Sequence, residues 1–253
     1  MSRVGLIGVG HLASYLVPGL LRGLEADQVL LSPRNRDKAA DLSRRYGVAV
    51  ARDNQELLAR CDLVLLATRP HQAAATVAAL SWRAEHTLVS LCAGLPLAAL
   101  DAGPAALARA MPISCAVIGE SPTCLTPDLP QVRALLAPLG PVLVLPDEAS
   151  FEVASVPSAL YGWVHALIGE TAQWAARAGL PEATARELIA QTLRGAAGMI
   201  QAEPERPIDD MIATLATPGG ITELGLTQLR AADAFAPWQD ACDAVLAKLR
   251  ARP

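Results

Sequence analysis

The sequence predicts an α/β protein in two parts, a doubly wound parallel sheet in residues 1–150 and an all-helical part in residues 151–253. Three observations support this division. Short apolar runs alternate with segments of helical periodicity through the first part, as in β-α-β units. A glycine-rich turn follows the first run, and no convincing strand occurs after residue 150. With 253 residues, 52% hydrophobic and 18% charged, the chain can build two small cores and is not disordered.

Strands are expected where a short run is almost entirely apolar, because the strands of a parallel sheet are buried on both faces. The segment between two such runs then forms the helix that connects them. The expected strands are residues 3–9, 28–32, 48–51, 63–67, 87–91, 106–110 and 142–145.

Helices are expected between these strands. Gly47 suits the left-handed position that ends a helix. Pro18 should kink the first helix, because proline lacks the N–H that a helix needs. The expected helices run from the glycine turn through Leu24 and over residues 37–46, 54–60, 72–80 and 130–137, with a turn or short helix beginning at 96–99.

The second part has helical periodicity throughout and large apolar faces for about 100 residues. A helical part of this kind often completes its core against another subunit, so we expect a homodimer or a higher homo-oligomer. The expected helices are residues 158–178, 182–201, 209–216, 222–232 and 236–250, with a linker at 204–207.

The turn Gly8-Val9-Gly10-His11-Leu12-Ala13 has the pattern G-x-G-x-x-A between a strand and a helix. The first glycine permits a tight turn, the second lets a pyrophosphate approach the backbone, and the small last residue lets the helix pack on the strand. The helix N-terminus then offers free N–H groups to the phosphates. The turn predicts a Rossmann-type dinucleotide site; the alternative is a structural turn without a ligand.

The segment after the second strand favours NADP(H) over NAD(H). An NAD site has an acidic residue there for the ribose hydroxyls. This chain has Ser32-Pro33-Arg34-Asn35-Arg36, which offers a hydroxyl, an amide and guanidinium groups to a 2′-phosphate. The alternative is an ordinary loop with solvent-facing arginines.

A second glycine turn, Thr217-Pro218-Gly219-Gly220-Ile221-Thr222, leads into a helical pattern in the second part. Its unhindered backbone N–H groups and the helix dipole suit a carboxylate. Thr217 and Thr222 add hydroxyls. The alternative is a plain connection between two helices.

Composition excludes several other classes of protein. The net charge of −4 and the pI of about 5.6 argue against nucleic-acid binding. The sequence contains no uninterrupted run of 18 apolar residues, so it predicts no membrane span. We expect a soluble, cytoplasmic protein. The five cysteines form no C-x-x-C and the four histidines have no metal-ligand spacing, so we expect reduced thiols and no metal.

Taken together in order along the chain, these motifs resemble the pyrroline-5-carboxylate reductase family over essentially the whole sequence. Further matching segments are Asp53-Asn54, Ser90-x-x-Ala93-Gly94, Arg109-x-Met111-Pro112 and Gly119-Glu120. The resemblance implies a Rossmann domain followed by a helical dimerisation domain. It also implies reduction of the C=N bond of 1-pyrroline-5-carboxylate to proline by NAD(P)H, and therefore a cyclic imino acid as the small-molecule partner.

The resemblance assigns roles to individual residues, with the substrate turn coming from the other subunit of a dimer. Thr222 is the candidate catalytic residue, as a group that positions the imine nitrogen. The implied sets are Gly8, Gly10, His11, Leu12 and Ala13 for the pyrophosphate; Ser32, Arg34 and Asn54 for the adenosine ribose and its phosphate; Ala67, Thr68, Arg69, Pro70, Ala93 and Gly94 for the nicotinamide; and Thr217, Gly219, Gly220, Ile221 and Thr222 for the substrate.

The chain also departs from the family pattern near the expected substrate. Residues 67–71 read Ala-Thr-Arg-Pro-His where the family has Ala-Val-Lys-Pro-Gln. Ile113 replaces the asparagine of Met-Pro-Asn, and residues 155–161 lack the two glycines of Ser-Gly-Ser-Gly-Pro-Ala-Tyr. Two alternatives to proline formation therefore stay open: reduction of another cyclic imine in secondary metabolism, and a dinucleotide-binding protein without catalysis.

Overall fold

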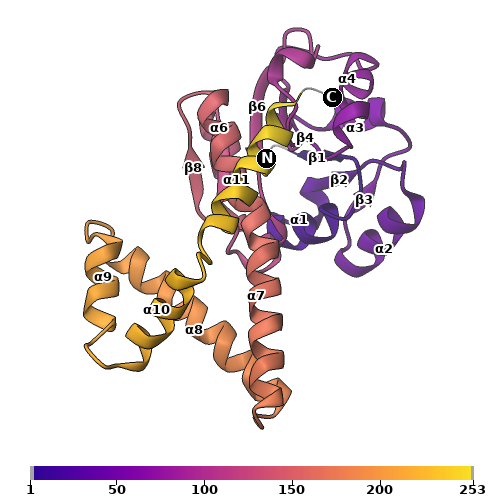
Figure 1. Cartoon of the computed structure of the whole chain (residues 1–253). Helices are drawn as coiled ribbons and strands as arrows, with labels where there is room; N and C mark the ends of the chain where they lie inside the picture. The colour runs from indigo at the N-terminus through magenta and orange to yellow at the C-terminus, as the bar shows by residue number, and fades with distance from the viewer. Residues whose placement is uncertain (1–2, 252–253) are drawn as a thin grey trace. The chain divides into compact units, whose positions relative to one another are not determined.

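The computed structural model describes residues 3–251, which form two compact units (Figure 1). The first unit runs to Ser158 and includes the end of the chain from Leu246 onward. The second unit is Ala159–Val245. Within the described residues, none of the helices is long and apolar enough to cross a membrane.

The first unit is built on one eight-stranded sheet with the strand order β3-β2-β1-β4-β5-β6-β7-β8 (Figure 1). The first six strands are parallel, which confirms the predicted doubly wound sheet. β7 pairs with β6 in the antiparallel direction and with β8 in parallel. The strands are β1 (Val4–Ile7), β2 (Val29–Leu31), β3 (Ala49–Val50), β4 (Leu63–Leu66), β5 (Thr87–Ser90), β6 (Ala106–Met111), β7 (Thr123–Thr126) and β8 (Val142–Val144).

Helices of this unit cover both faces of the sheet. Short 3-10 turns, labelled η, complete several of the connections. The helices are α1 (Ala13–Leu20), α2 (Arg36–Tyr46), α3 (Asn54–Arg60), α4 (Pro70–Ala78), α5 (Pro130–Leu136) and α6 (Glu148–Ser155), and the 3-10 turns are η1 (Ala26–Gln28), η2 (Leu97–Ala99), η3 (Ser114–Ile118) and η4 (Ala137–Leu139).

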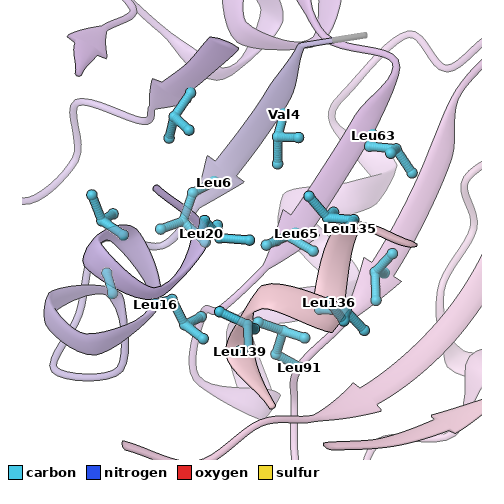
Figure 2. Close-up of a cluster of buried hydrophobic side chains, with 14 of the residues drawn as sticks. Val4, Leu6, Leu16, Leu20, Leu63, Leu65, Leu91, Leu135, Leu136 and Leu139 are labelled. Carbon is cyan, nitrogen blue, oxygen red and sulfur yellow. The ribbon is translucent and has the colours of Figure 1, made fainter. Parts of the chain in front are cut away.

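Alternation along β1 sends its side chains into two separate cores. Val4 and Leu6 belong to a cluster that includes side chains of α1, α2 and α5, and Figure 2 shows Leu16 and Leu20 of α1 meeting this face of the sheet. Ile7 belongs to a second cluster with side chains of α3 and α4. Burial on both faces explains why the strand sequences are apolar at nearly every position.

The first helix is shorter than predicted. α1 ends at Leu20, two residues after Pro18 and four before the predicted end at Leu24. Pro18 lies inside the helix and has no N–H to donate to the preceding turn, and the residues after Leu20 form turns.

One strand and one α-helix of this unit were not predicted. β7 has only four residues between Pro122 and Pro127, and no element was predicted over the residues of α6. Asp147 caps α6, because its side chain accepts the backbone N–H of Ser150 at 2.7 Å.

The second unit is helical, as predicted. It contains α7 from Ala159 onward (Pro157–Arg177 in full), α8 (Glu182–Ala202), α9 (Ile208–Leu215), α10 (Ile221–Ala231) and most of α11 (Ala236–Arg250). Its buried apolar cluster is small and consists of Ala172, Ala175 and Ala185, with Ile189 packed against it. Large apolar side chains instead stay exposed: Trp174, Leu188, Met199, Leu215, Ile221 and Leu224.

All five cysteines are free thiols. Cys61, Cys92, Cys115 and Cys124 are buried in the first unit, whereas Cys242 on α11 is half-buried. Burial raises the pKa of each of the four thiols of the first unit, to about 12 for Cys61.

Candidate active site

The predicted cofactor residues meet at one edge of the sheet. They follow β1, β2, β4 and β5, whose parallel carboxyl ends lie together, and Asn54 begins α3 after β3. The strand order reverses between β1 and β4, because β2 and β3 are added on one side of β1 whereas β4, β5 and β6 are added on its other side. Such a switch point is where open α/β sheets bind ligands.

Gly8 makes the turn after β1 possible. Its φ is +99°, and a Cβ there would lie 2.6 Å from the backbone of Ala67 after β4. Its N–H donates to the Ser32 hydroxyl at 3.1 Å, which ties the first turn to the end of β2. Ser32 is only 1% exposed, so its hydroxyl oxygen has a structural role in addition to the predicted contact with the cofactor.

Gly10 leaves open space above the start of α1. A Cβ at this position would meet no heavy atom within 4 Å. Among residues 3–251, the backbone N–H groups of His11, Leu12 and Ala13 donate to no protein acceptor, and no side chain caps the helix. Free N–H groups at a helix start next to open space suit a pyrophosphate.

Two loops form the other side of this edge. The thiol of Cys92 donates to the carbonyl of Thr68 at 3.3 Å, which joins the loop after β5 to the loop after β4. Gly94 follows with a φ of +69°, and a Cβ there would lie 3.0 Å from the carbonyl oxygen of Leu249. The sheet thus brings residues 67–70 and 93–94 to neighbouring loops, as their predicted role requires.

The basic segment after β2 is available to a ligand. Arg34 and Arg36 are exposed, and neither takes part in an ion pair within the described part of the chain. The carboxylate of Asp53 is occupied, because it accepts the backbone N–H of Glu56 at 2.7 Å and so caps α3. Asn54 is half-buried beside it.

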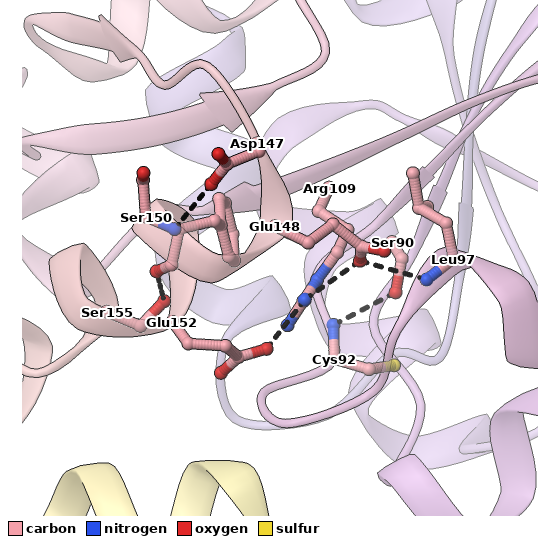
Figure 3. Close-up of polar contacts among 10 residues, drawn as sticks. Ser90, Cys92, Leu97, Arg109, Asp147, Glu148, Ser150, Glu152 and Ser155 are labelled. Atoms are coloured by element: carbon pink, nitrogen blue, oxygen red, sulfur yellow. Dashed lines mark hydrogen bonds and ion pairs between the residues drawn. The ribbon is translucent and has the colours of Figure 1, made fainter.

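An ion-pair cluster around the buried Arg109 lies beside the loop after β5 (Figure 3). Arg109 on β6 is 1% exposed and contacts Glu148 at 2.9 Å and Glu152 at 2.6 Å, both on α6. Its guanidinium also lies over the ring of Phe151, 4.5 Å from the centroid. Sequence reasoning used Arg109 only as part of a family motif. The sequence signal for this cluster is the spacing of Glu148 and Glu152, which places both carboxylates on one face of a helix.

The predicted substrate turn lies in the second unit. Gly220 N–H donates to the Thr217 carbonyl at 2.8 Å, and α10 begins at the next residue. Gly219 N–H donates to the carboxylate of Glu223 at 2.7 Å. Ile221 is 91% exposed and Thr222 is exposed. The structure therefore keeps this set together, but in a different unit from the cofactor set.

Two departures from the family pattern line one cavity of the first unit. Ile113 borders an apolar cavity of about 260 Å³ together with Pro157 and Ser158 from the segment 155–161. Cys124 of β7 and Leu143 of β8 complete this side of it. The two changes, 42 or more residues apart in the sequence, thus alter the same place.

Two family models match the chain. One described as an F420-dependent NADP oxidoreductase matches residues 3–94, and one described as the pyrroline-5-carboxylate reductase dimerisation domain matches residues 151–251. The curated relatives that match most of the chain are pyrroline-5-carboxylate reductases, so the chain is similar to this family over both of its parts. Among curated members, pyrroline-5-carboxylate reductase 2 of Bacillus subtilis is 25% identical over 91% of this chain and 87% of its own length.

Solved structures of the same family share the fold. The reductase of Streptococcus pyogenes is 24% identical, with a TM-score of 0.86 over 98% of both chains. The enzyme of Plasmodium falciparum, solved with NADP bound, is 19% identical, with a TM-score of 0.86 over 99% of this chain and 97% of its own. These similarities cover both units of the chain.

Proposed function

We propose that the protein reduces 1-pyrroline-5-carboxylate to L-proline with NADPH. The observation that carries the proposal is the turn at Gly8–Ala13, placed at the switch point of a reductase-family fold with free N–H groups and open space. The bound cofactor supplies the hydride that adds to the C=N carbon. The protein must bind both molecules and hold the reacting carbon against the nicotinamide.

The residues at the sheet edge fit NADP(H) better than NAD(H). The open space at Gly10 and the N–H groups of residues 11–13 fit the pyrophosphate. Arg34 offers a free guanidinium for the 2′-phosphate, with Ser32 and Asn54 beside the ribose. Residues 67–70 and 93–94 line the nicotinamide.

The turn at Thr217–Thr222 receives the substrate. Backbone N–H groups at the start of α10 suit the carboxylate, and the Thr222 hydroxyl holds the imine nitrogen. A hydroxyl is too weak an acid to be the sole proton source, so Thr222 acts by position. Exposed apolar side chains of the helical unit favour a homodimer in which this turn serves the other subunit's cofactor. The five free thiols favour the cytoplasm as its compartment.

A turnover assay tests the activity directly. Purified protein with NADPH and 1-pyrroline-5-carboxylate should consume NADPH and form proline in equal amounts. Tight NADPH binding without turnover of any cyclic imine would contradict the enzymatic proposal and favour a binding protein.

The apolar cavity at Ile113 favours a second candidate, reduction of a larger or more apolar cyclic imine. A six-membered ring imino acid should then have a higher kcat/KM than the five-membered substrate. Ile113→Asn, which restores the family residue, should shift that ratio toward the five-membered ring. An unchanged ratio would remove this candidate.

We predict that Arg34→Ala weakens NADPH binding by about tenfold to a hundredfold, because the 2′-phosphate loses a charged hydrogen bond. NADH binding should change by less than about twofold, since NADH lacks that phosphate. Titration of both cofactors measures this difference. Arg45→Ala is a control for charge, because Arg45 lies on α2 and pairs with Asp41 at 3.6 Å. Equal losses for NADPH and NADH would contradict the cofactor assignment.

We predict that Thr222→Ala lowers kcat/KM for the imine by about tenfold, the effect of one lost hydrogen bond in the transition state. NADPH affinity should stay normal, because the cofactor residues lie in the first unit. Steady-state kinetics and cofactor titration check the two parts. Thr222→Ser keeps the hydroxyl and should retain most activity; a Thr222→Ala enzyme of normal rate would exclude this role.

A further inference from the structure

Glu148 connects the buried Arg109 to the loop after β5. One of its carboxylate oxygens, Oε1, accepts from Arg109 Nη1 at 2.9 Å and from the backbone N–H of Leu97 at 3.0 Å (Figure 3). Glu152 also forms an ion pair with Arg109, with Oε1 2.6 Å from Nη1, but within residues 3–251 it makes no hydrogen bond to the backbone of this loop. The two acids therefore share one partner and differ in a single contact.

The hydrogen bond between Leu97 and Glu148 lies at the end of the segment 92–97, which contains Ala93 and Gly94, the residues predicted to line the nicotinamide. Cys92 begins the segment and is held by Thr68 and by the Ser90 hydroxyl. Leu97 ends it as the first residue of η2. Within residues 3–251, Ala93, Gly94 and Leu95 make no hydrogen bonds of their own. The position of these three residues thus depends on the hydrogen bonds at the two ends of the segment, at Cys92 and at Leu97.

Arg109 fixes the Glu148 carboxylate. The guanidinium is buried on β6, in register with Ser90 of β5 and Thr126 of β7, and lies over Phe151. The side chain of Glu148 is 37% exposed and would otherwise have several rotamers open to it. A charge-assisted bond to a buried partner selects the rotamer that reaches Leu97.

We propose that Glu148, held by Arg109, is a positioning residue that sets the loop Ala93–Leu97 against the nicotinamide end of the cofactor. The inference rests on the proposed NADPH-dependent function and adds a residue that touches neither cofactor nor substrate. It assigns Glu152 to stability alone.

Two ligands separate positioning from general stability. NADPH carries the nicotinamide, whereas adenosine 2′,5′-bisphosphate carries the same 2′-phosphate without it. In Glu148→Ala, the NADPH dissociation constant should rise by about tenfold, with adenosine 2′,5′-bisphosphate affinity unchanged. Glu148→Gln should stay within about twofold for both ligands, because the amide oxygen can accept both hydrogen bonds.

Glu152→Ala is the matched control, since it removes an Arg109 partner without touching the loop. It should lower the unfolding temperature and leave both dissociation constants within about twofold. Leu97→Pro removes the backbone donor together with the half-buried leucine side chain, at the first position of a short helix where proline is tolerated, and Leu97→Ala, which keeps the N–H, is its control. Leu97→Pro should reproduce the selective loss of NADPH affinity even where Glu148→Ala does not fold.

Equal losses for both ligands in Glu148→Ala, or a similar NADPH loss in Glu152→Ala, would overturn the proposal. Normal NADPH affinity in Leu97→Pro would overturn it as well. A wild-type protein that binds neither ligand would instead contradict the proposed function, so the two failures are distinguishable.

Discussion

Replacing Gly10 with alanine should weaken NADPH binding by on the order of a hundredfold or more, because the new methyl group occupies the approach of the pyrophosphate to the backbone. The same change should leave the unfolding temperature nearly unaltered, since a Cβ at Gly10 meets no protein atom within 4 Å. Isothermal titration and thermal unfolding measure the two properties separately.

Gly8→Ala is the structural counterpart in the same turn. Its Cβ would lie 2.6 Å from the backbone of Ala67, at a φ of +99° that alanine rarely adopts. We expect a loss of stability of about 3 kcal/mol together with loss of NADPH binding. If Gly10→Ala proved as unstable as Gly8→Ala, or bound NADPH normally, the assignment of the open space to the pyrophosphate would be wrong.

Arg109→Met should destabilise the first unit by about 3 kcal/mol, because it leaves two carboxylates beside a buried site without their cation. Arg109 is 1% exposed, and both of its ion pairs converge on one nitrogen, Nη1. Denaturant unfolding at a fixed protein concentration measures the change through the shift in midpoint.

Arg133→Met provides the control for this prediction. Arg133 pairs with Asp128 at 2.6 Å, as short as the contact between Arg109 and Glu152, but both side chains are largely exposed. Exposed pairs contribute about 1 kcal/mol or less. Similar midpoints for the two variants would show that burial does not decide the contribution of Arg109. Adding Glu148→Gln and Glu152→Gln to Arg109→Met should recover part of the loss.

The sequence predicted the parts of the fold that have local signals. The apolar runs located six parallel strands. The grouping of Gly8, Arg34 and Gly94 around one cofactor came from the glycine turn, the basic segment and the family resemblance, and it stays a prediction. The helical unit was equally clear from periodicity, and both turns formed where glycine pairs occurred.

The remaining parts depend on distant contacts. β7 has four residues and pairs in the antiparallel direction with β6, a relation that no local pattern specifies. The partners of Arg109 lie 39 residues or more further along the chain, on α6, a helix that was not predicted. An ion pair between two elements could not be expected when one of them was not predicted. For the same reason, the common cavity of Ile113 and Pro157 became visible only in three dimensions.

The difference in burial between the thiols allows one cysteine to be labelled selectively. Four cysteines are buried in the first unit with raised pKa values, so they stay protonated at neutral pH and react slowly with alkylating reagents. Cys242 is the half-buried fifth and belongs to the helical unit. A fluorophore could therefore be attached at one site of the wild-type chain, where its emission would report on encounters between subunits without any engineered cysteine.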